Sequence, residues 1–490
     1  MKKLNILSVS SELAPYSKTG GLADVAAALP KAIARQGHHV TMVTPYYGFI
    51  GGQNLPLTVL PKTVTVTVAG RSFGVGYKKL VLNPNLTIYF VANRELFGRS
   101  EKIYGTTNDN LRFLVFNIAT LRLAETLTPK PDVIHCHDWQ TGLIPNLLRT
   151  EPRKFPTLRR VATLFTIHNL TFQMGPDWWE VPMSKRDDGR CKPLRCGKRL
   201  RFLNCTKRAI FHADVINTVS ERYAEEITTP EYGQSLDKYL RNRRADLYGI
   251  INGIDYTVYN PAYDPHIRYH YDWNSLGRKQ KNKEALQRLV GLERNPDLPL
   301  IGVVNRLTEQ KGFNLIMETL EVLMRLPIQI VIVGTGTKEY VHFFRRAARQ
   351  HPKKLAFYTP FTESMASKVF AGSDMFLMPS RFEPCGLSQL ISLRYGSIPI
   401  VHETGGLSDT ITNFNPRTRK GNGFVFRNYA GNYFLIALAR ALENFKYTQT
   451  WEYLTWRAMQ QTYSWELPSK KYLKLYEIAI AKKRARRRTR

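Results

Sequence analysis

The chain has 490 residues, which suggests two or three domains of ordinary size. Hydrophobic residues make up 43% of it, enough for sizeable cores, and this excludes a highly charged disordered chain. Charge is the unusual feature, because 71 Lys and Arg against 39 Asp and Glu give a formal net charge of +32, which favours anionic ligands or polyanions.

Other features exclude a membrane-spanning or disulfide-rich protein. No run of eighteen apolar residues occurs, so we expect no membrane span. The apolar stretch after Lys3 is short and interrupted by polar residues, which is typical of a first strand rather than a signal peptide. Five scattered cysteines do not make a disulfide framework. We therefore expect a cytoplasmic protein, with export by a route that needs no signal as an alternative.

The first half of the chain alternates short apolar runs with amphipathic stretches, which is typical of an α/β domain with a mostly parallel sheet. A βαβ unit is expected from a strand at 4–10, a helix at 22–36 after Gly20-Gly21, and a strand at His39–Pro45. Further strands are expected at 86–91, Val133–His137, 162–168 and 215–219, with a helix at 109–125.

A second series of the same kind begins near residue 299, after a polar stretch at 249–274. We expect strands at Leu300–Val304, 328–334, 354–358, 375–379 and 398–401, with helices at 313–326, 340–351, 364–372 and 387–395. A final amphipathic helix is expected at 463–482. The fold class is therefore α/β, with domains at 1–250 and 251–462 and a basic tail at 483–490, and ligands are expected just after the strands, in a cleft between two doubly wound domains.

The first strand is followed by Lys18 and the pair Gly20-Gly21. Glycines let backbone N–H groups approach a ligand, and the next helix directs its positive end there. Together with the Lys18 charge, this pattern suits a phosphate or pyrophosphate; a tight turn with no ligand is the alternative.

Asp138 and His168 follow two later strands of the first half. An Asp at a strand end suits hydroxyl binding or charge stabilisation, and His168 can reach the same edge. His135, His137 and Asp138 could also be read as metal ligands, but no second cluster completes a site, so we expect no metal there.

In the second half, Arg306 and Lys311 flank a turn after the first strand. A guanidinium that can bind two oxygens at once and a Lys ammonium five residues later could together bind two phosphates. An exposed basic loop with no ligand is the alternative. No D-x-D pair occurs in the sequence, so a metal-bridged diphosphate is not expected. Arg306 and Lys311 would take the place of the metal.

Glu383 follows a later strand and precedes a helix start. A carboxylate beside backbone N–H groups can hold sugar hydroxyls and balance developing positive charge. The neighbouring backbone groups belong to Cys385, Gly386 and Leu387, and Thr404-Gly405-Gly406 repeats the anion-cradle pattern after the next strand.

Seven motifs then occur in order along nearly the whole chain: KTGGLADV, HDW, TIHNL, NGID, RLTEQKG, PSRFEPCGL and TGGLSDT. With these motifs the chain resembles bacterial glycogen synthases and plant starch synthases. The resemblance implies a GT-B fold with a last helix that returns to the first domain. It also implies transfer of glucose from ADP-glucose to an α-1,4-glucan such as glycogen, with retention of anomeric configuration and no metal or other cofactor.

The resemblance also implies roles for residues. Lys18 and Gly21 would contact the donor phosphates, and Arg306 and Lys311 would neutralise the leaving diphosphate. Glu383 would lie by the glucosyl ring. The remaining implied contacts are His168 and Asp138 near the reacting sugar, the backbone of Cys385, Gly386 and Leu387, and Phe361 beside the adenine. We favour same-face attack assisted by the departing phosphate, because no carboxylate is obviously placed as a nucleophile.

Two features depart from this pattern or compete with it. Relatives usually have Gly directly after Gln173, whereas here Met174 intervenes before Gly175. The stretch 184–208 is unusually basic and contains Cys191, Cys196 and Cys205, but no fourth zinc ligand is evident. One competing function is that of a related transferase that uses UDP-glucose or makes sucrose or another small glycoside. The other is nucleic-acid binding through the excess positive charge. No nucleic-acid module accompanies that charge, so we expect no nucleic-acid partner.

Overall fold

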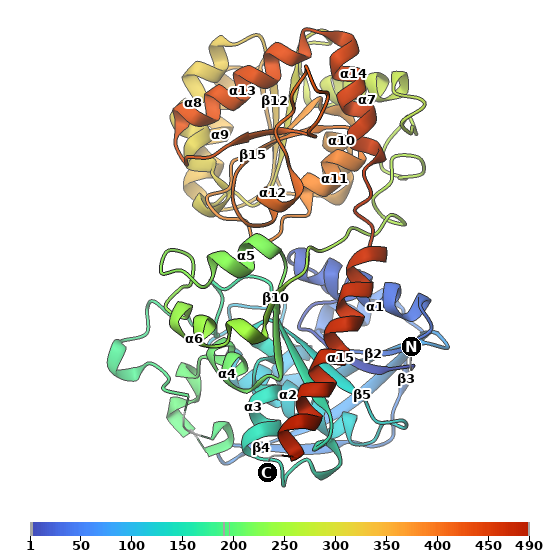
Figure 1. Cartoon of the computed structure of the whole chain (residues 1–490), viewed down its shortest axis with the longest axis vertical. Coiled ribbons are helices and arrows are strands. Elements are labelled where there is room, and N and C mark those ends of the chain that lie inside the picture. The colour runs from blue at the N-terminus through green and yellow to red at the C-terminus, as the bar shows by residue number, and fades with distance from the viewer. Residues whose placement is uncertain (1–2, 190–191, 196, 489–490) are drawn as a thin grey trace. The chain divides into compact units, whose positions relative to one another are not determined.

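The computed structural model describes residues 3–189, 192–195 and 197–488 (Figure 1). The chain divides into two compact units. One comprises Met1–Asn252 with Trp465–Arg490, and the other comprises Gly253–Ser464. Within the described residues, no helix combines the length and the apolar character needed to cross a bilayer.

The first unit is built on a ten-stranded sheet with the order β10-β9-β8-β7-β1-β2-β6-β5-β3, and β4 pairs with β5 beside this path. The strands from β10 to β6 run parallel, whereas β5 is antiparallel to β6, β3 and β4. The strands are β1 (Asn5–Val9), β2 (His39–Pro45), β3 (Thr58–Val59), β4 (Val64–Val68), β5 (Arg71–Asn83), β6 (Leu86–Ala92), β7 (Val133–His137), β8 (Ala162–Ile167), β9 (Val215–Thr218) and β10 (Leu247–Gly249).

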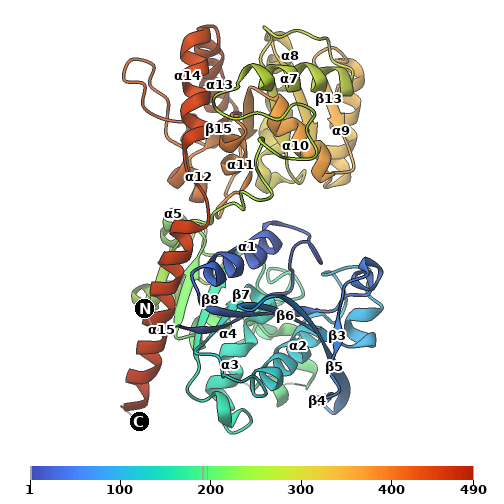
Figure 2. The same cartoon turned by 90° about the vertical axis from the view of Figure 1, so that its right-hand side faces the viewer.

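Helices cover both faces of this sheet, which explains why β7 and β8 are buried along their whole length. Figure 2 shows α1 on one side of the strands and α2, α3 and α4 on the other. The helices of this unit are α1 (Gly21–Arg35), α2 (Asp109–Ala124), α3 (Leu143–Thr150), α4 (Cys205–His212), α5 (Glu221–Glu226), α6 (Asp237–Asn242) and α15 (Glu466–Arg488).

The last helix returns to the first unit. α15 packs on α1 and on strands β7, β8 and β9. Its buried side chains include Tyr472 and Tyr476, which belong to the core of that unit. The helix extends beyond the expected end at residue 482 and runs to Arg488, so most of the basic segment 483–490 is helical.

The second unit has a six-stranded, fully parallel sheet with the order β13-β12-β11-β14-β15-β16. Its strands are β11 (Leu300–Val304), β12 (Gln329–Val333), β13 (Leu355–Tyr358), β14 (Met375–Met378), β15 (Ile398–His402) and β16 (Phe424–Phe426). Its helices are α7 (Gly277–Val290), α8 (Phe313–Arg325), α9 (Lys338–Gln350), α10 (Glu363–Gly372), α11 (Ser388–Arg394), α12 (Gly405–Thr410), α13 (Gly431–Phe445) and α14 (Thr448–Gln460).

Each sheet has a point where the strand order reverses, between β1 and β7 in the first unit and between β11 and β14 in the second. In open α/β sheets, ligands bind outside the carboxyl ends of the strands at such points. The segments that follow these four strands are therefore the first place to look for a site.

Candidate active site

In the second unit, the segments after β11 and β14 bring Lys311 and Glu383 together. The Lys311 Nζ lies 2.9 Å from Glu383 Oε1 and 2.6 Å from Oε2. Ser380 Oγ donates a further hydrogen bond of 3.0 Å to Oε2. The Glu383 side chain is only 6% exposed and that of Lys311 16%, so this ion pair is largely shielded from water.

A close backbone approach holds these two segments. Gly312 has φ +77°, and a Cβ at this position would lie 1.9 Å from the Pro379 carbonyl oxygen. The amide of Arg381 donates to the Gln310 carbonyl oxygen at 2.9 Å. Only glycine fits at position 312, and its absence of a side chain allows the Lys311 segment to lie against the segment that carries Glu383.

The turn before α12 lies against the backbone of the Glu383 segment. The Gly406 amide donates to the Glu383 carbonyl oxygen at 3.0 Å. A Cβ on Gly405 would lie 2.0 Å from that oxygen, and one on Gly406 would lie 2.1 Å from the Cys385 carbonyl oxygen. The predicted cradle residues Thr404, Gly405, Gly406 and Cys385 are therefore buried beside Glu383, with Gly386 and Leu387 partly exposed.

The other two residues predicted in this unit are open to solvent. Arg306 is exposed, and no carboxylate in the described part of the chain pairs with its guanidinium. Phe361 is 44% exposed. Both side chains are thus accessible to a ligand, whereas Lys311 and Glu383 are already engaged with each other.

In the first unit, the loop after β1 carries Lys18, Gly20 and Gly21 into the start of α1. Lys18 Nζ lies 2.8 Å from Asp24 Oδ1. The buried carboxylate of Glu12 accepts hydrogen bonds from the Thr19 amide at 2.5 Å and the Gly20 amide at 3.2 Å. Glu12 therefore occupies two of the backbone donors of the expected anion-binding loop.

Glu12 was missed by the sequence analysis. Its carboxylate also accepts from Thr19 Oγ1 at 2.7 Å and from the Tyr104 hydroxyl at 2.6 Å. The sequence signal for it was an acidic residue shortly after the first strand, but its partner Tyr104 is 92 residues away. Glu12 orders the loop that carries Lys18.

Asp138 follows β7 in a conformation that is unusual for a residue with a side chain, with φ 56° and ψ −178°. Its Oδ1 accepts from the His168 amide at 2.7 Å, and its own amide donates to the Thr166 carbonyl oxygen. Burial raises the pKa of the Asp138 carboxyl to about 7, although the amides of His168 and Asn169 oppose this rise. Asp138 and His168 thus lie side by side at the reversal point of the first sheet.

Three histidines meet at this edge. His137 Nδ1 lies 3.0 Å from His168 Nε2, and the rings of His135 and His137 are 4.0 Å apart. Burial lowers the pKa of the His168 imidazole to about 3, and those of His135 and His137 well below their usual range. All three rings are therefore neutral at physiological pH.

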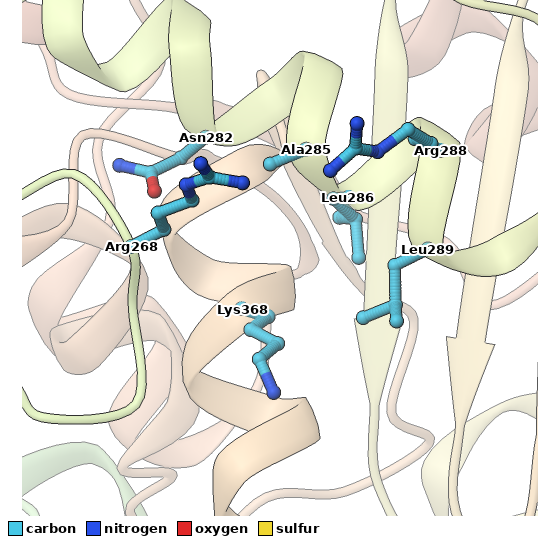
Figure 3. Close-up of a pocket in the computed structure, with 7 residues that line it drawn as sticks. All are labelled: Arg268, Asn282, Ala285, Leu286, Arg288, Leu289 and Lys368. Carbon is cyan, nitrogen blue, oxygen red and sulfur yellow. The ribbon is translucent and has the colours of Figure 1, made fainter.

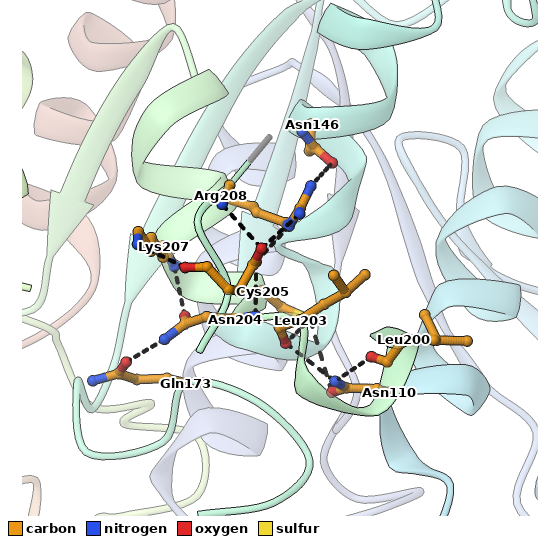
Figure 4. Close-up of polar contacts among 11 residues, drawn as sticks. Asn110, Asn146, Gln173, Leu200, Leu203, Asn204, Cys205, Lys207 and Arg208 are labelled. Atoms are coloured by element: carbon orange, nitrogen blue, oxygen red, sulfur yellow. Dashed lines mark hydrogen bonds and ion pairs between the residues drawn. The ribbon is translucent and has the colours of Figure 1, made fainter. Parts of the chain in front are cut away.

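Part of the basic stretch 184–208 is structural (Figure 4). The Arg208 guanidinium is buried and forms two short contacts with Asp187, at 2.6 and 2.7 Å. Asn204 Oδ1 caps α4 by accepting from the Lys207 amide at 2.8 Å. Burial raises the pKa of the Cys205 thiol to about 12, so it is not a ready zinc thiolate. Cys191 and Cys196 lie outside the described residues, within which no group of three metal-ligating side chains is found.

A hollow of about 240 Å³ lies between α7 and α10 of the second unit (Figure 3). It is lined by Arg268, Asn282, Ala285, Leu286, Arg288, Leu289 and Lys368. None of these residues belongs to a predicted motif or follows β11 or β14, so the hollow has no part in the site described above.

Family comparisons agree with the motifs. Residues 5–242 match the model described as the starch synthase catalytic domain, and residues 290–453 match glycosyl transferases group 1. The glycogen synthase of Streptococcus uberis is 40% identical over 484 residues, which cover 96% of this chain and 99% of that protein. The glycogen synthase of Pseudothermotoga lettingae is 39% identical over 489 residues, covering 98% and 100%.

Solved structures are similar as well. The catalytic domain of starch synthase IV from Arabidopsis thaliana, bound to ADP and acarbose, matches with a TM-score of 0.85 and 30% identity, covering 98% of this chain and 100% of that one. Sucrose-phosphate synthase from Thermosynechococcus elongatus matches with a TM-score of 0.61 at 16% identity, a likeness of fold alone.

Proposed function

The chain belongs to the family of starch synthases and bacterial glycogen synthases, and we propose that it uses ADP-glucose as donor and the non-reducing end of glycogen as acceptor. It has the GT-B fold, and its activity is glycosyl transfer from a sugar nucleotide to a glucan in glycogen synthesis. The proposal concerns the identity of the nucleotide, the residues that act, and the independence from metal.

The observation that carries the proposed site is the shielded contact between Lys311 and Glu383 at the reversal point of the second sheet. When the bond from glucose to the diphosphate breaks, negative charge grows on the leaving group. Lys311 and the exposed Arg306 would neutralise it, and groups fixed in place before the reaction stabilise such charge most effectively.

Glu383 would face the sugar side of the same bond. Its carboxylate is held by Lys311 and Ser380, and its carbonyl oxygen by Gly406. A fixed carboxylate can accept hydrogen bonds from sugar hydroxyls and balance the positive charge that develops on the glucosyl ring. The backbone around Cys385, Gly386 and Leu387 and the turn at Thr404 to Gly406 would bind the donor beside it.

In the first unit, Lys18 and Gly21 would contact the donor phosphates, and Asp138 and His168 would contact the reacting sugar. The Gly20 amide is held by Glu12, so Gly20 would shape the loop rather than bind the anion. Retention without a placed nucleophile favours same-face attack, with the departing phosphate taking the proton of the acceptor hydroxyl. A trapped glucosyl ester on Asp138 or Glu383 would contradict this route.

Two further parts of the proposal rest on residue chemistry. Without a D-x-D pair, the donor diphosphate would be neutralised by Arg306 and Lys311 instead of a divalent cation. Three described cysteines, Cys136, Cys205 and Cys385, are buried and not joined by disulfides, which suits a reducing compartment such as the cytoplasm.

The test is a donor screen with a glycogen primer. ADP-, UDP- and GDP-glucose are compared by initial rate, each with and without a chelator of divalent cations. We expect ADP-glucose to give the highest kcat/KM, with no loss on chelation. A higher kcat/KM with UDP-glucose would contradict the donor assignment, and loss of activity on chelation would contradict metal independence.

A further inference from the structure

Behind His168 lies a chain of polar side chains that reaches strand β1. His168 Nε2 contacts His137 Nδ1 at 3.0 Å, and His137 Nε2 contacts Ser8 Oγ at 3.3 Å. Ser8 is 5% exposed and His137 is fully buried. Water therefore does not compete for these hydrogen bonds, and the positions of their protons follow from the partners that are present.

His135 shows how such an assignment works. Thr166 Oγ1 donates to Asn217 Oδ1 at 2.8 Å, so it can only accept from His135 Nε2, 2.7 Å away. His135 Nε2 therefore carries the proton, and Nδ1 accepts from the Tyr476 hydroxyl at 2.9 Å. His135 is thus fixed as a single tautomer and contacts His137 only through the ring faces.

The pair His137–His168 allows two arrangements of protons. In the first, Ser8 donates to His137 Nε2, His137 Nδ1–H donates to His168 Nε2, and His168 carries its proton on Nδ1. In the second, the direction of each hydrogen bond is reversed. His168 Nε2–H donates to His137 Nδ1, His137 Nε2–H donates to Ser8 Oγ, and His168 Nδ1 is bare. Both arrangements keep all rings neutral.

The two arrangements differ at Ser8. In the second, the Ser8 hydroxyl hydrogen has no acceptor, because Oγ contacts no other polar group among the described residues. A buried donor without a partner is costly, so the first arrangement is favoured. In that arrangement His168 Nδ1 carries a hydrogen, and this nitrogen has no partner within the described ranges 3–189, 192–195 and 197–488.

We propose that Ser8 and His137 are positioning residues that hold His168 as its Nδ1–H tautomer, so that the ring offers a hydrogen-bond donor to an oxygen of the reacting sugar. This inference rests on the proposed function, in which His168 contacts the sugar. A donor at this position can bind a hydroxyl or ring oxygen, whereas the bare nitrogen of the other tautomer could only accept.

The absence of charge on His137 and His168 fits the same chemistry. Burial holds the pKa of His168 at about 3 and that of His137 well below its usual range, so the contact between them joins two uncharged rings. An imidazolium beside a glucosyl centre that gains positive charge would oppose the reaction. A neutral N–H donor avoids that repulsion.

The first test reads the tautomer directly and needs no activity. The full chain is labelled with ¹⁵N-histidine, and long-range proton–nitrogen spectra distinguish protonated from bare ring nitrogens, with His168 and His137 assigned from His168→Gln and His137→Gln variants. We expect His168 to be protonated on Nδ1 and bare on Nε2. Protonation on Nε2 would overturn the proposal whether or not the chain transfers glucose.

The second test is Ser8→Ala, which removes the donor that favours the first arrangement. We expect the His168 Nδ1 resonance to shift toward the bare-nitrogen range and kcat to fall about tenfold, the equivalent of one hydrogen bond, with the donor KM within twofold of wild type. A Ser8→Ala variant with the wild-type spectrum and kcat would overturn the proposal.

Thr44→Val is the matched control, because it removes a buried hydroxyl from the neighbouring strand β2, where Oγ1 has no hydrogen-bond partner among the described residues. We expect wild-type histidine resonances and kcat within twofold. An equal loss of kcat in Thr44→Val would show that any buried hydroxyl matters and would overturn the specific role of Ser8. If the wild-type chain transfers no glucose while its spectrum shows the expected tautomer, the proposed function fails and the tautomer assignment stands.

Discussion

The Lys311 ammonium contacts both carboxylate oxygens of Glu383, although the two residues are 72 positions apart and follow different strands. Ser380 adds a third hydrogen bond to the same carboxylate. A largely buried pair depends on both partners, because removal of one leaves the other charged and unpaired. Lys311 and Glu383 are therefore expected to act as one unit in the donor site.

We expect Lys311→Ala and Glu383→Ala each to lower the rate of glucose incorporation from ADP-glucose into glycogen at least about a hundredfold, since one well-placed electrostatic contact contributes that much. The rate of the double variant should be only slightly below that of the less active single variant, because the effects of groups that act together are not additive. Incorporation of radiolabelled glucose into precipitated glycogen measures all three.

Arg381→Ala is the matched control for this pair. Arg381 and Glu309 form an ion pair of 2.7 Å between the same two segments, but both side chains are about 60% exposed. Exposed pairs contribute little, so a change of less than about threefold is expected. The assignment is wrong if Arg381→Ala loses as much as Lys311→Ala, or if neither single variant reaches a hundredfold loss.

A second prediction concerns the backbone that brings Lys311 to Glu383. Gly312 and Gly291 share φ +77°, but a Cβ at Gly312 meets the Pro379 carbonyl oxygen, whereas a Cβ at Gly291 meets no atom of the described part of the chain within 4 Å. Gly291→Ala should lower the free energy of unfolding by about 1–2 kcal/mol, because alanine disfavours this backbone conformation, and should leave the rate of glucosyl transfer unchanged. Gly312→Ala should cost more and lower the rate at least about tenfold. Urea unfolding and initial rates measure both effects, and equal effects of the two substitutions would contradict the role of Gly312.

A third prediction follows from the Asp138 carboxyl, whose pKa is raised by burial to about 7. Between about pH 4 and pH 7 the folded state holds a proton that the unfolded state has lost, so this group reduces stability as pH rises through that window. Asp138→Asn keeps the oxygen that accepts from the His168 amide and removes the buried charge. We expect it to raise the free energy of unfolding at pH 8 by up to about 4 kcal/mol, with a corresponding rise in Tm, and to change both little at pH 4.

Asp177→Asn serves as the control for this prediction, because Asp177 is exposed and should leave the pH dependence of Tm unchanged. Glucosyl transfer should fall in Asp138→Asn but not in the control. An Asp138→Asn variant that is destabilised at pH 8 as much as at pH 4 would show that the buried carboxylate is not costly.

The sequence predicted the strands best where burial is complete. Strands β7, β8, β11 and β14 are buried at every position, and the rule that ligands bind at strand ends led to Asp138, His168, Lys311 and Glu383. Helix α7 was missed because its sequence is mostly polar. Its Lys279 is buried and donates to the carbonyl oxygens of Ala371 and Ser373 at 2.9 and 2.8 Å. No local pattern indicates such a contact.

The site residues that escaped prediction have partners far along the chain. Glu12 is joined to Tyr104 across 92 residues, and Ser8 to His137 across 129. A serine in an apolar strand gives no sign of whether its hydroxyl orients a histidine on the neighbouring strand. The candidate substrate-contacting residues could thus be proposed from motifs, whereas the residues that hold them in place required the fold.

The final prediction concerns the contact between α15 and the catalytic edge of the first unit. The Tyr476 hydroxyl lies 2.9 Å from His135 Nδ1, and the Tyr472 hydroxyl lies 3.0 Å from Asn217 Oδ1. Tyr476→Phe leaves the buried His135 nitrogen without a donor and should cost about 1–3 kcal/mol. Tyr472→Phe should cost less, because Asn217 Oδ1 still accepts from Thr166. Urea unfolding of the full chain gives the order of the two losses. An equal or reversed order would contradict the greater dependence of the buried His135 ring on the Tyr476 hydroxyl.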